Sequence, residues 1–544
     1  MSFKLAIYIT NNKLTKIEKD FIELSKKSTH YQIKKIIIDE QSNKASFNPL
    51  KLFKLLFFAC INFFDKLFGK GIKHLNNHHQ SFLTTSANIP IQYFSSQSSN
   101  DQCSSFKKDI LLLKDQNLDF IISFGNSFNQ NNLHKASNLG LLNVHYGKIT
   151  NTYNLNKYIG FFETLNKIST TSFNIRHQGN CKLPRSSYSS ASITTFFPFR
   201  LNSMRVQRKS LFFLNKFLEN INYDEIVFDQ KYLEVMSMNS EYNPPSIMDS
   251  FRYLIQAITI LSKSLYMKVF NHAGRWSIGY FKLDDINNIK IRNLKIIKNH
   301  PDQFLADPFL FEKDNSIYCF AEDYSYSSRI GKIRAFLLQD NDAIDLGIAL
   351  EESFHLSYPN IFSINDEVFM CPETSENKDI RLYKSTNFPM KWSFHKSLIQ
   401  DISAADTNIF YYDGRWWLFT NIDSSDLDDH CSELHIFYSD AFDSSNWIAH
   451  KKNPVIANSQ KSRNAGLIEY QDTIYRNFQV QDYNFYGKSF GLSKIIQLDT
   501  DNYIEEILDT IDPTFLKNIR GSHHFSYING MAAIDFYRHE NIKK

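Results

Sequence analysis

The chain has 544 residues, of which 42% are hydrophobic and 22% charged, with a formal net charge of +4. This length exceeds what a single hydrophobic core serves, so we expect two or three domains. The small net charge and the lack of a dense lysine and arginine run exclude a phosphate-binding track, and with it nucleic acid as a partner. The six cysteines are scattered without a Cys-x-x-Cys pair, which argues against a disulfide framework and a zinc site and indicates a reducing compartment.

The N-terminal segment begins with an apolar run over residues 3–9, which predicts a buried strand. This run is too short for a signal peptide and has no small-residue cleavage site, so we expect a cytoplasmic protein. Residues 15–26 predict a helix, and residues 32–38 predict a second strand. A strand, a helix and a strand at this spacing indicate a βαβ unit with a parallel sheet.

Residues 50–75 form the most apolar stretch of the chain. Lysines and one aspartate interrupt it, so it lacks the roughly 20 uncharged residues that a membrane span needs. The pattern fits two alternatives: a helix packed inside the protein, or a basic amphipathic helix that rests on a membrane surface. The second alternative predicts peripheral membrane contact through residues 50–75, at the inner membrane surface.

Residues 118–125 predict a buried strand ending at a glycine turn, and residues 139–145 predict the strand that follows. This segment resembles the fold of methionyl-tRNA and sugar-nucleotide formyltransferases, whose Asn-x-His motif matches Asn143 and His145. The resemblance implies an α/β, Rossmann-like domain over residues 1–200, with formyl-tetrahydrofolate as its cofactor. It also implies that Asn143 orients the formyl carbonyl and that His145 handles the proton of the attacking amine, roles that suit an amide donor and an imidazole.

The formyltransferase motif is incomplete in this sequence. Residues 146–150 read Tyr-Gly-Lys-Ile-Thr in place of the family loop, and residues 173–184 hold no carboxylate where the family has an aspartate. Without that carboxylate, a histidine that deprotonates an amine loses the group that orients it. We therefore predict a degenerate site at Asn143 and His145.

Residues 201–270 are predicted to form a helical linker region. Asn243-Pro244-Pro245 breaks the chain, and apolar residues then recur at helical spacing from 247 to 265. This spacing predicts a helix over 246–268 that packs on one of the domains through its apolar face.

Residues 271–540 repeat one unit five times. The repeat is anchored at positions 48 to 58 residues apart, namely Asp307, Tyr358, Asp406, Asn464 and Ser522. Seven residues after each anchor stands a pair of turn residues, such as Asp314-Asn315 or Asp413-Gly414, and an apolar run then resumes. Such pairs accept the positive φ of tight hairpin turns, and a hairpin in every period of roughly fifty residues indicates an all-β, five-bladed propeller. Residues 273–280 are predicted to supply a strand that closes the ring.

Five short sequence motifs in this region resemble those of one domain family. They lie at residues 306–311, 355–359, 372–374, 413–419 and 453–455. The resemblance, over residues 276–538, is to the N-terminal domain of plant glucosamine inositolphosphorylceramide transferase, a domain that also occurs in bacterial glycan-locus proteins. More distantly, the region resembles five-bladed glycoside hydrolases of the family-43 type.

The anchors are expected to converge, because the innermost strand of each blade starts near the axis of a propeller. By resemblance to the glycosidases, Asp307 is the base and Asp406 the carboxylate that tunes its neighbour. Glu373, at the far end of the second strand of its blade, is a third catalytic candidate. Paired carboxylates suit glycosyl chemistry because one can hold a proton while the other stays ionised. Arg463 stands where the glycosidases have their acid, which counts against simple hydrolysis.

Further side chains are predicted to bind substrate at the axis. They are Tyr358, His355, Arg463, His523, His524 and Glu322. An axis with arginine and histidine suits a phosphorylated or anionic sugar better than a neutral one. The pair His523-His524 lacks a spaced set of partner ligands, so we predict no metal site.

The sequence as a whole predicts a multidomain protein of cytoplasmic glycan or polysaccharide biosynthesis. The propeller would bind or transfer a sugar unit from an activated donor, with a sugar nucleotide or a glycan acceptor as partner. Two alternatives stay open: an amino-sugar N-formyltransferase that uses the propeller as a substrate platform, and a non-catalytic carbohydrate-binding scaffold.

Overall fold

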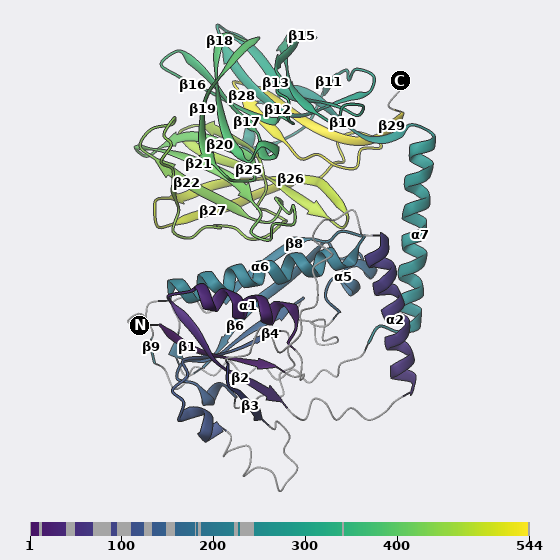
Figure 1. Cartoon of the computed structure of the whole chain (residues 1–544). Coiled ribbons are helices and arrows are strands. Elements are labelled where there is room, and N and C mark those ends of the chain that lie inside the picture. The colour runs from purple at the N-terminus through teal and green to yellow at the C-terminus, as the bar shows by residue number, and fades with distance from the viewer. Residues whose placement is uncertain are drawn as a thin grey trace. The chain divides into compact units, whose positions relative to one another are not determined.

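The computed structural model describes residues 2–9, 14–39, 49–68, 89–94, 110–124, 133–147, 158–179, 181–182, 187–221, 227–228, 244–339 and 342–541. The chain forms two compact units, residues 1–257 and residues 258–544 (Figure 1).

A seven-stranded sheet in the order β3-β2-β1-β4-β5-β6-β8 forms the centre of the N-terminal unit. The first five strands in this order are parallel to their neighbours, and β6 and β8 are antiparallel. The strands are β1 (Phe3–Ile9), β2 (Tyr31–Asp39), β3 (Ile91–Phe94), β4 (Phe120–Phe124), β5 (Gly140–Tyr146), β6 (Thr170–Gln178) and β8 (Ser187–Ile193), and a separate two-stranded sheet pairs β7 (Cys181–Lys182) with β9 (Val227–Phe228).

The predicted βαβ unit is confirmed, because helix α1 (Lys16–Lys27) lies in the chain between the parallel strands β1 and β2. The start of α1 follows from its sequence. The Glu18 carboxylate accepts hydrogen bonds from Thr15 N at 2.6 Å and from Thr15 Oγ1 at 2.8 Å, which satisfies donors at the helix N-terminus. The mixed sheet does not by itself identify a formyltransferase or Rossmann-like fold, so that finer assignment stays a prediction.

Helices α2 (Pro49–Phe68), α6 (Phe199–Asn220) and α7 (Ile247–Val269) meet at one buried carboxylate. Asp65 of α2 accepts hydrogen bonds from the backbone N–H of Phe199 at 3.1 Å and of Arg200 at 3.3 Å, at the start of α6. Tyr253 of α7 donates its hydroxyl to the same carboxylate at 2.6 Å. The first N–H groups of a helix have no partner within the helix, so Asp65 caps α6 from outside and joins the three helices.

The helices also revise the expected division of the chain. The sequence predicts a separate helical region over residues 201–270, but α6 packs against β6 and β8 and therefore belongs to the N-terminal unit. Helix α7 contains the boundary between the two units, at residues 257 and 258. Further short helices in the described part of the chain include α5 (Phe161–Leu165) and the 3₁₀ helices η3 (Leu133–Ala136), η6 (Ile286–Asn288) and η7 (Ser375–Asn377).

The predicted helix at residues 50–75 ends at Phe68, and residues 69–75 lie outside the described part of the chain. Its apolar residues are divided between two environments: Phe58 and Ile61 are buried, whereas Leu56 and Phe63 are exposed. Among the helices of the described residues, none is long and apolar enough to cross a membrane.

Five four-stranded antiparallel sheets form the second unit, which confirms the predicted five blades (Figure 1). In order from the inner to the outer strand, the first two blades are β12 (Gln303–Lys313), β13 (Ser316–Ser325), β14 (Gly331–Leu338) and β15 (Ala343–Leu350), then β16 (Ser357–Ile364), β17 (Glu367–Glu373), β18 (Asp379–Asn387) and β19 (Lys391–Gln400). The third and fourth are β20 (Ala404–Tyr412), β21 (Arg415–Ile422), β22 (Leu434–Ser439) and β23 (Ile448–Ala449), then β24 (Asn464–Tyr470), β25 (Thr473–Asp482), β26 (Phe485–Leu498) and β27 (Tyr503–Ile511).

The fifth blade joins the two ends of the propeller chain. Its strands are β28 (Phe525–Ile528), β29 (Met531–Asn541), β10 (His272–Lys282) and β11 (Lys295–Ile297). Strand β10 pairs along its whole length with β29, so the predicted closure by residues 273–280 is confirmed. Each inner strand also contacts the inner strand of the next blade, and β28 contacts β12, which completes the ring.

The five predicted turn pairs all adopt the left-handed backbone that tight hairpins need. Both residues of every pair have positive φ, from +43° at Asn529 to +83° at Gly530. The pairs are Asp314-Asn315, Asn365-Asp366, Asp413-Gly414, Gln471-Asp472 and Asn529-Gly530. The turns therefore fix the register of the inner two strands in each blade.

We predict that Asp65→Ala destabilises the N-terminal unit by about 2–4 kcal/mol, because it leaves the Tyr253 hydroxyl and the first N–H groups of α6 without an acceptor. The midpoint of urea unfolding, followed by circular dichroism, measures this loss. Glu23→Ala is the control, since Glu23 pairs with Lys26 on the surface and exposed pairs contribute less than about 1 kcal/mol. Equal midpoints for the two variants would show that Asp65 does not hold the helices together.

Candidate functional site

The first four inner strands each interrupt their pairing close to where they start. The breaks lie between Ala306 and Phe309, Ser357 and Asn360, Ala405 and Asn408, and Asn464 and Leu467. In the first three blades the first residue of the break is Asp307, Tyr358 or Asp406, each in the left-handed region with φ of +51°, +46° and +49°. This conformation costs a non-glycine residue about 1–2 kcal/mol, and such strain and bulges occur where a side chain is aimed at a functional site.

Asp406 is held by a buried arginine from the next blade. Arg463 Nε lies 2.6 Å from Asp406 Oδ2, and Arg463 Nη2 lies 3.3 Å from Oδ1. Gln479 donates to Asp406 Oδ2 at 3.1 Å, and the Asp406 backbone N–H donates to Glu373 at 3.3 Å. Arg463 also lies over the Tyr486 ring, 4.9 Å from its centroid.

Asp307 is the end of a chain of three ionisable groups. Asp535 Oδ2 lies 2.7 Å from His523 Nδ1, and His523 Nε2 lies 3.3 Å from Asp307 Oδ1. The Asp307 backbone N–H donates to Asp535 at 3.3 Å. Asp307 Oδ1 is shielded from solvent, and among the described residues nothing donates a hydrogen bond to it, so it is the acceptor in the cluster that a ligand would satisfy.

Burial sets the protonation of the two anchor carboxyls. It raises the pKa of Asp307 to about 7, against the opposing charge of His523. It raises the pKa of Asp406 to about 6, against the opposing charge of Arg463. Burial would also lower the pKa of His523, but the Asp535 and Asp307 carboxylates outweigh it and raise that pKa. Asp307 therefore exchanges its proton near neutral pH, as a general acid or base requires.

Glu322 and Glu373 flank the anchors from neighbouring strands, and His355 lies in the loop before β16. Glu322 lies opposite Ala306 on β13, and Glu373 lies opposite Ser357 on β17, so both are next to an anchor. His355 Nε2 lies 3.4 Å from Glu322 Oε1. Burial raises the pKa of Glu322 well above its usual range, and the charges of Asp307 and Glu373 act in the same direction.

Tyr358 and His524 lie in the interior beside the cluster, and among the described residues neither ring nitrogen of His524 has a hydrogen-bond partner. The Tyr358 hydroxyl accepts from Gly466 N at 2.7 Å and from Asn408 Nδ2 at 3.0 Å, which joins three blades. The His524 ring packs against Phe309 and Tyr358, with centroids 4.6 Å and 5.2 Å away, and burial lowers its pKa to about 3. His524 thus stays neutral, and both residues support the cluster through packing and orientation.

The sequence did not indicate two members of the cluster, Asp535 and Tyr486. Asp535 lies on β29 and Tyr486 on β26, away from the anchor positions of the repeat. In the first four blades, the seventh residue after the turn pair is polar, and these positions hold Glu322, Glu373, Asn421 and Gln479. This regularity indicates that the second strand of each of these blades places a polar residue near the axis. Asp535 follows its turn pair by only five residues, so it does not fit the pattern.

The charge balance differs from the one the sequence suggested. Five carboxyl groups, those of Asp307, Glu322, Glu373, Asp406 and Asp535, stand beside the cations Arg463 and His523. Arg463 is already bound by Asp406 and lies 3.7 Å from Glu373. The axis is therefore acidic, and the expected preference for an anionic sugar does not follow from it.

Asp307, His523 and Asp535 offer ligand atoms that lie within 4.8 Å of one another, close enough for a metal ion. The two carboxylates, however, face opposite nitrogens of the imidazole. That arrangement orients the ring and holds a proton, as in acid–base relays, and does not direct all three groups at one ion.

Asn143 and His145 lie two residues apart on β5, and both are buried. Arg176 of β6 pairs with Asn143. Burial, and to a lesser extent the charge of Arg176, lowers the pKa of His145 to about 4. A formyltransferase site needs a carboxylate that raises the basicity of this histidine, so a cation beside it does not fit the folate-dependent chemistry.

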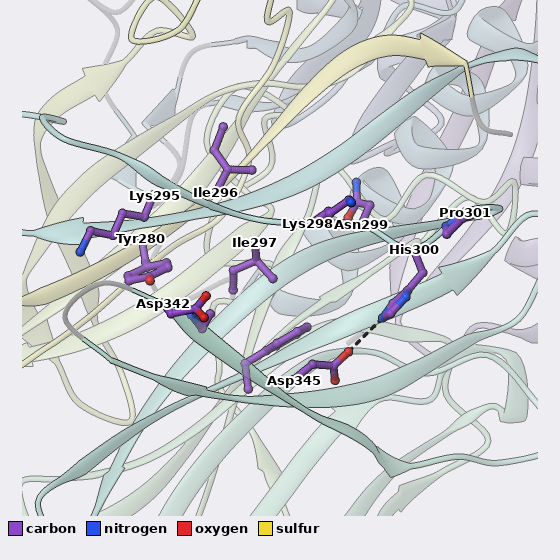
Figure 2. Close-up of a pocket in the computed structure, with 12 residues that line it drawn as sticks. Tyr280, Lys295, Ile296, Ile297, Lys298, Asn299, His300, Pro301, Asp342 and Asp345 are labelled. Atoms are coloured by element: carbon purple, nitrogen blue, oxygen red, sulfur yellow. Dashed lines mark hydrogen bonds and ion pairs between the residues drawn. The ribbon is translucent and has the colours of Figure 1, made fainter. Parts of the chain in front are cut away.

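A separate pocket lies between outer strands of the first and fifth blades (Figure 2). It is lined by Tyr280, Lys295, Ile296, Ile297, Lys298, Asn299, His300, Pro301, Phe336, Asp342, Ala343 and Asp345. His300 Nε2 meets Asp345 Oδ2 at 2.9 Å across it. The predicted site residues all lie elsewhere, so this pocket is distinct from the axial cluster.

Residues 272–522 match the family described as "Glucosamine inositolphosphorylceramide transferase 1, N-terminal". Two similar proteins are glucosamine inositolphosphorylceramide transferase 1 of Oryza sativa subsp. japonica, 36% identical over 211 residues, and of Arabidopsis thaliana, 32% identical over 263 residues. These alignments cover 38% and 43% of this chain but only 28% and 34% of the relatives. The resemblance of the propeller is thus confirmed, whereas the family match does not extend to residues 1–200 and leaves the formyltransferase resemblance unsupported.

Solved structures similar to the chain include Zg3597, a family 117 glycoside hydrolase of Zobellia galactanivorans, with a TM-score of 0.33 and 10% identity over 48% of this chain and 90% of that one. The α-L-arabinanase of Cellvibrio cellulosa has a TM-score of 0.29 and 11% identity over 37% of this chain and 77% of that one.

We predict that Asp307→Asn gains thermal stability relative to the wild type as the pH rises. The folded Asp307 carboxyl keeps its proton up to about pH 7, whereas an unfolded one loses it near pH 4, so the wild type loses stability between these values. The variant has no such proton to lose, and the difference should reach roughly 2–4 kcal/mol at pH 8. Melting temperatures from pH 4 to pH 8 measure it.

The matched control is Asp307→Ala, which also lacks the carboxyl. Alanine tolerates the left-handed backbone less well than asparagine. The free energy of unfolding of this variant should therefore be about 1 kcal/mol lower than that of Asp307→Asn, by the same amount at every pH. A difference between wild type and Asp307→Asn that stays flat with pH would contradict the raised pKa.

We predict that the N-terminal unit does not transfer formyl groups, because His145 is a weak base beside Arg176. Incubation with formyl-tetrahydrofolate and several amino-sugar nucleotides, followed by mass spectrometry, should yield no formyl product. Product that disappears in His145→Ala would establish the opposite.

Proposed function

We propose that the chain is a transferase of glycan biosynthesis whose propeller binds the sugar unit at its axis. The single observation behind this proposal is the buried Asp307 carboxyl, with a pKa of about 7, whose Oδ1 has an ion-pair contact with His523 but no hydrogen-bond donor among the described residues. It lies among acids that converge from several blades. The match of residues 272–522 to the N-terminal region of glucosamine inositolphosphorylceramide transferase 1 supports sugar transfer as the reaction class.

In the proposed reaction, Asp307 accepts the proton of an acceptor hydroxyl. The oxygen then forms a bond to the anomeric carbon of an activated sugar, and the bond from that carbon to the phosphate leaving group breaks, the leaving group taking the electron pair. Asp535 and His523 orient Asp307, while Asp406 stays ionised through Arg463. Two carboxyls with different protonation states provide the acid–base pair that glycosyl chemistry uses.

An amine-bearing sugar is the substrate class that fits the cluster best. The acidic groups outnumber the cations, and Arg463 is already bound to Asp406. A protonated amine would offset the remaining negative charge of the buried carboxylates. The word glucosamine in the names of the relatives agrees with this choice. Ligand access would be past His355, Arg463 and Glu373, whose side chains keep 27%, 15% and 12% of their surface exposed.

We predict that Asp307→Asn lowers sugar transfer by about 10²–10⁴-fold, the contribution of a general base, without lowering the melting temperature at pH 7. A panel of nucleotide-activated sugars with and without an amine, analysed by mass spectrometry, measures turnover, and calorimetry measures affinity for each donor. Asp413→Asn is the matched control, because Asp413 has the same left-handed backbone (φ +47°) but is exposed in a hairpin turn.

Asp406→Asn is a less clean test, because it removes the charge that pairs with the buried Arg463. Loss of one partner of a buried ion pair costs about 3–5 kcal/mol, so this variant should melt earlier as well as bind less. Normal turnover in Asp307→Asn would place the site elsewhere. If the protein binds a sugar in a way that depends on Asp307 but turns over none of the donors, the non-catalytic scaffold is supported.

A further inference from the structure

Helix α7 exposes an apolar stripe in the part that belongs to the N-terminal unit. The stripe consists of Met248, Phe251 and Ile255, each at least half exposed. These residues recur at intervals of three, four or seven, so they lie on one face of the helix. The buried residues of α7 are Ser250, Tyr253 and Ala257, two of them small and all on the opposite face. The helix is therefore apolar on its exposed face, while its buried face contributes Tyr253 and Ala257 to the core.

Helix α2 is also apolar on the face that it exposes. Leu52, Leu56 and Phe63 lie on that face and are between 47% and 67% exposed, while the inward face holds Phe58 and Ile61 as well as Asp65. The two helices touch, since the Phe57 and Phe251 rings stack 5.5 Å apart and Tyr253 donates to Asp65. We call Leu52, Phe53, Leu56 and Phe63 of α2, with Met248 and Phe251 of α7, the α2–α7 surface.

The charges beside this surface are cationic. Lys66 and Arg252 are exposed on the two helices, and Arg252 also lies 3.7 Å from Asp249. The acidic residues of α2 and α7 are Asp65 and Asp249. Asp65 is buried with its hydrogen-bond donors, and Asp249 accepts from Ser246 N and Oγ at the start of α7. An apolar face with basic residues at its edge is the composition of helices that lie in the interface of an anionic membrane.

We propose that the α2–α7 surface binds the surface of a bilayer that contains anionic lipid. The apolar side chains would enter the boundary between headgroups and acyl chains, and the lysine and arginine side chains would reach the lipid phosphates. A second copy of the chain is a poorer occupant, because it would bring the same cations together. The proposal is independent of the axial site, and either can fail without the other.

The test is cosedimentation of the full chain with vesicles of phosphatidylcholine alone and of phosphatidylcholine mixed with phosphatidylglycerol. We predict binding to the mixed vesicles that weakens as salt is raised, because salt screens the attraction of the cations. The triple variant Leu56→Gln/Phe63→Gln/Met248→Gln, which keeps good helix formers, should bind at least tenfold less.

The matched control is Ile344→Gln/Ile504→Gln/Ile507→Gln, which removes three exposed apolar residues from the outer propeller strands β15 and β27. It should bind like the wild type. Equal loss in both triple variants, or a wild type that ignores anionic vesicles, overturns the proposal. So does concentration-dependent dimerisation, seen by analytical ultracentrifugation, that only the α2–α7 variant loses, because the surface would then join two copies.

Discussion

The axial cluster depends on one backbone constraint, the left-handed residue at the start of an inner strand. At this position the antiparallel ladder skips two residues, and the first of them is free to turn its side chain towards the axis. Asp307 and Asp406 suit it because aspartate accepts positive φ better than most side chains. The proline that follows Asp307 suits it as well, since Pro308 has no N–H to donate where the ladder is interrupted.

Turning carboxyls inward creates an electrostatic cost that a single blade cannot offset. Arg463, which compensates Asp406, stands just before the inner strand of the next blade, and His523, which faces Asp307, stands before the strand that precedes β12 around the ring. Each acid is thus neutralised across a blade boundary. Closure of the ring by β10 and β29 is consequently a condition for the chemistry of the site as well as for stability.

The sequence was sufficient for features set by local backbone chemistry. The turn pairs, the five blades and the convergence of Asp307 and Asp406 follow from residues that tolerate positive φ and from a regular period. Features that depend on pairing between blades were not predictable. The sequence suggested Arg463 as a cation that binds a ligand, yet its partner in the structure is Asp406. Asp535 could not be predicted as a member of the cluster, because its distance from the turn differs from that of the equivalent residues in the other blades. In the fourth blade the bulge falls on Ala465 and Gly466, one residue after the Asn464 anchor.

The helices show a different limit of sequence patterns. Helical spacing identified the residues of α7 that share a face, but it could not say which face the protein covers. In a blade that question is settled locally, because the turn fixes the register and alternate residues must point to opposite sides of the sheet. In α7 it is settled by the hydrogen bond from Tyr253 to Asp65, a contact between residues 188 positions apart. Because Tyr253 and Ala257 face inward, the apolar stripe of Met248, Phe251 and Ile255 stays exposed on the other side of the helix.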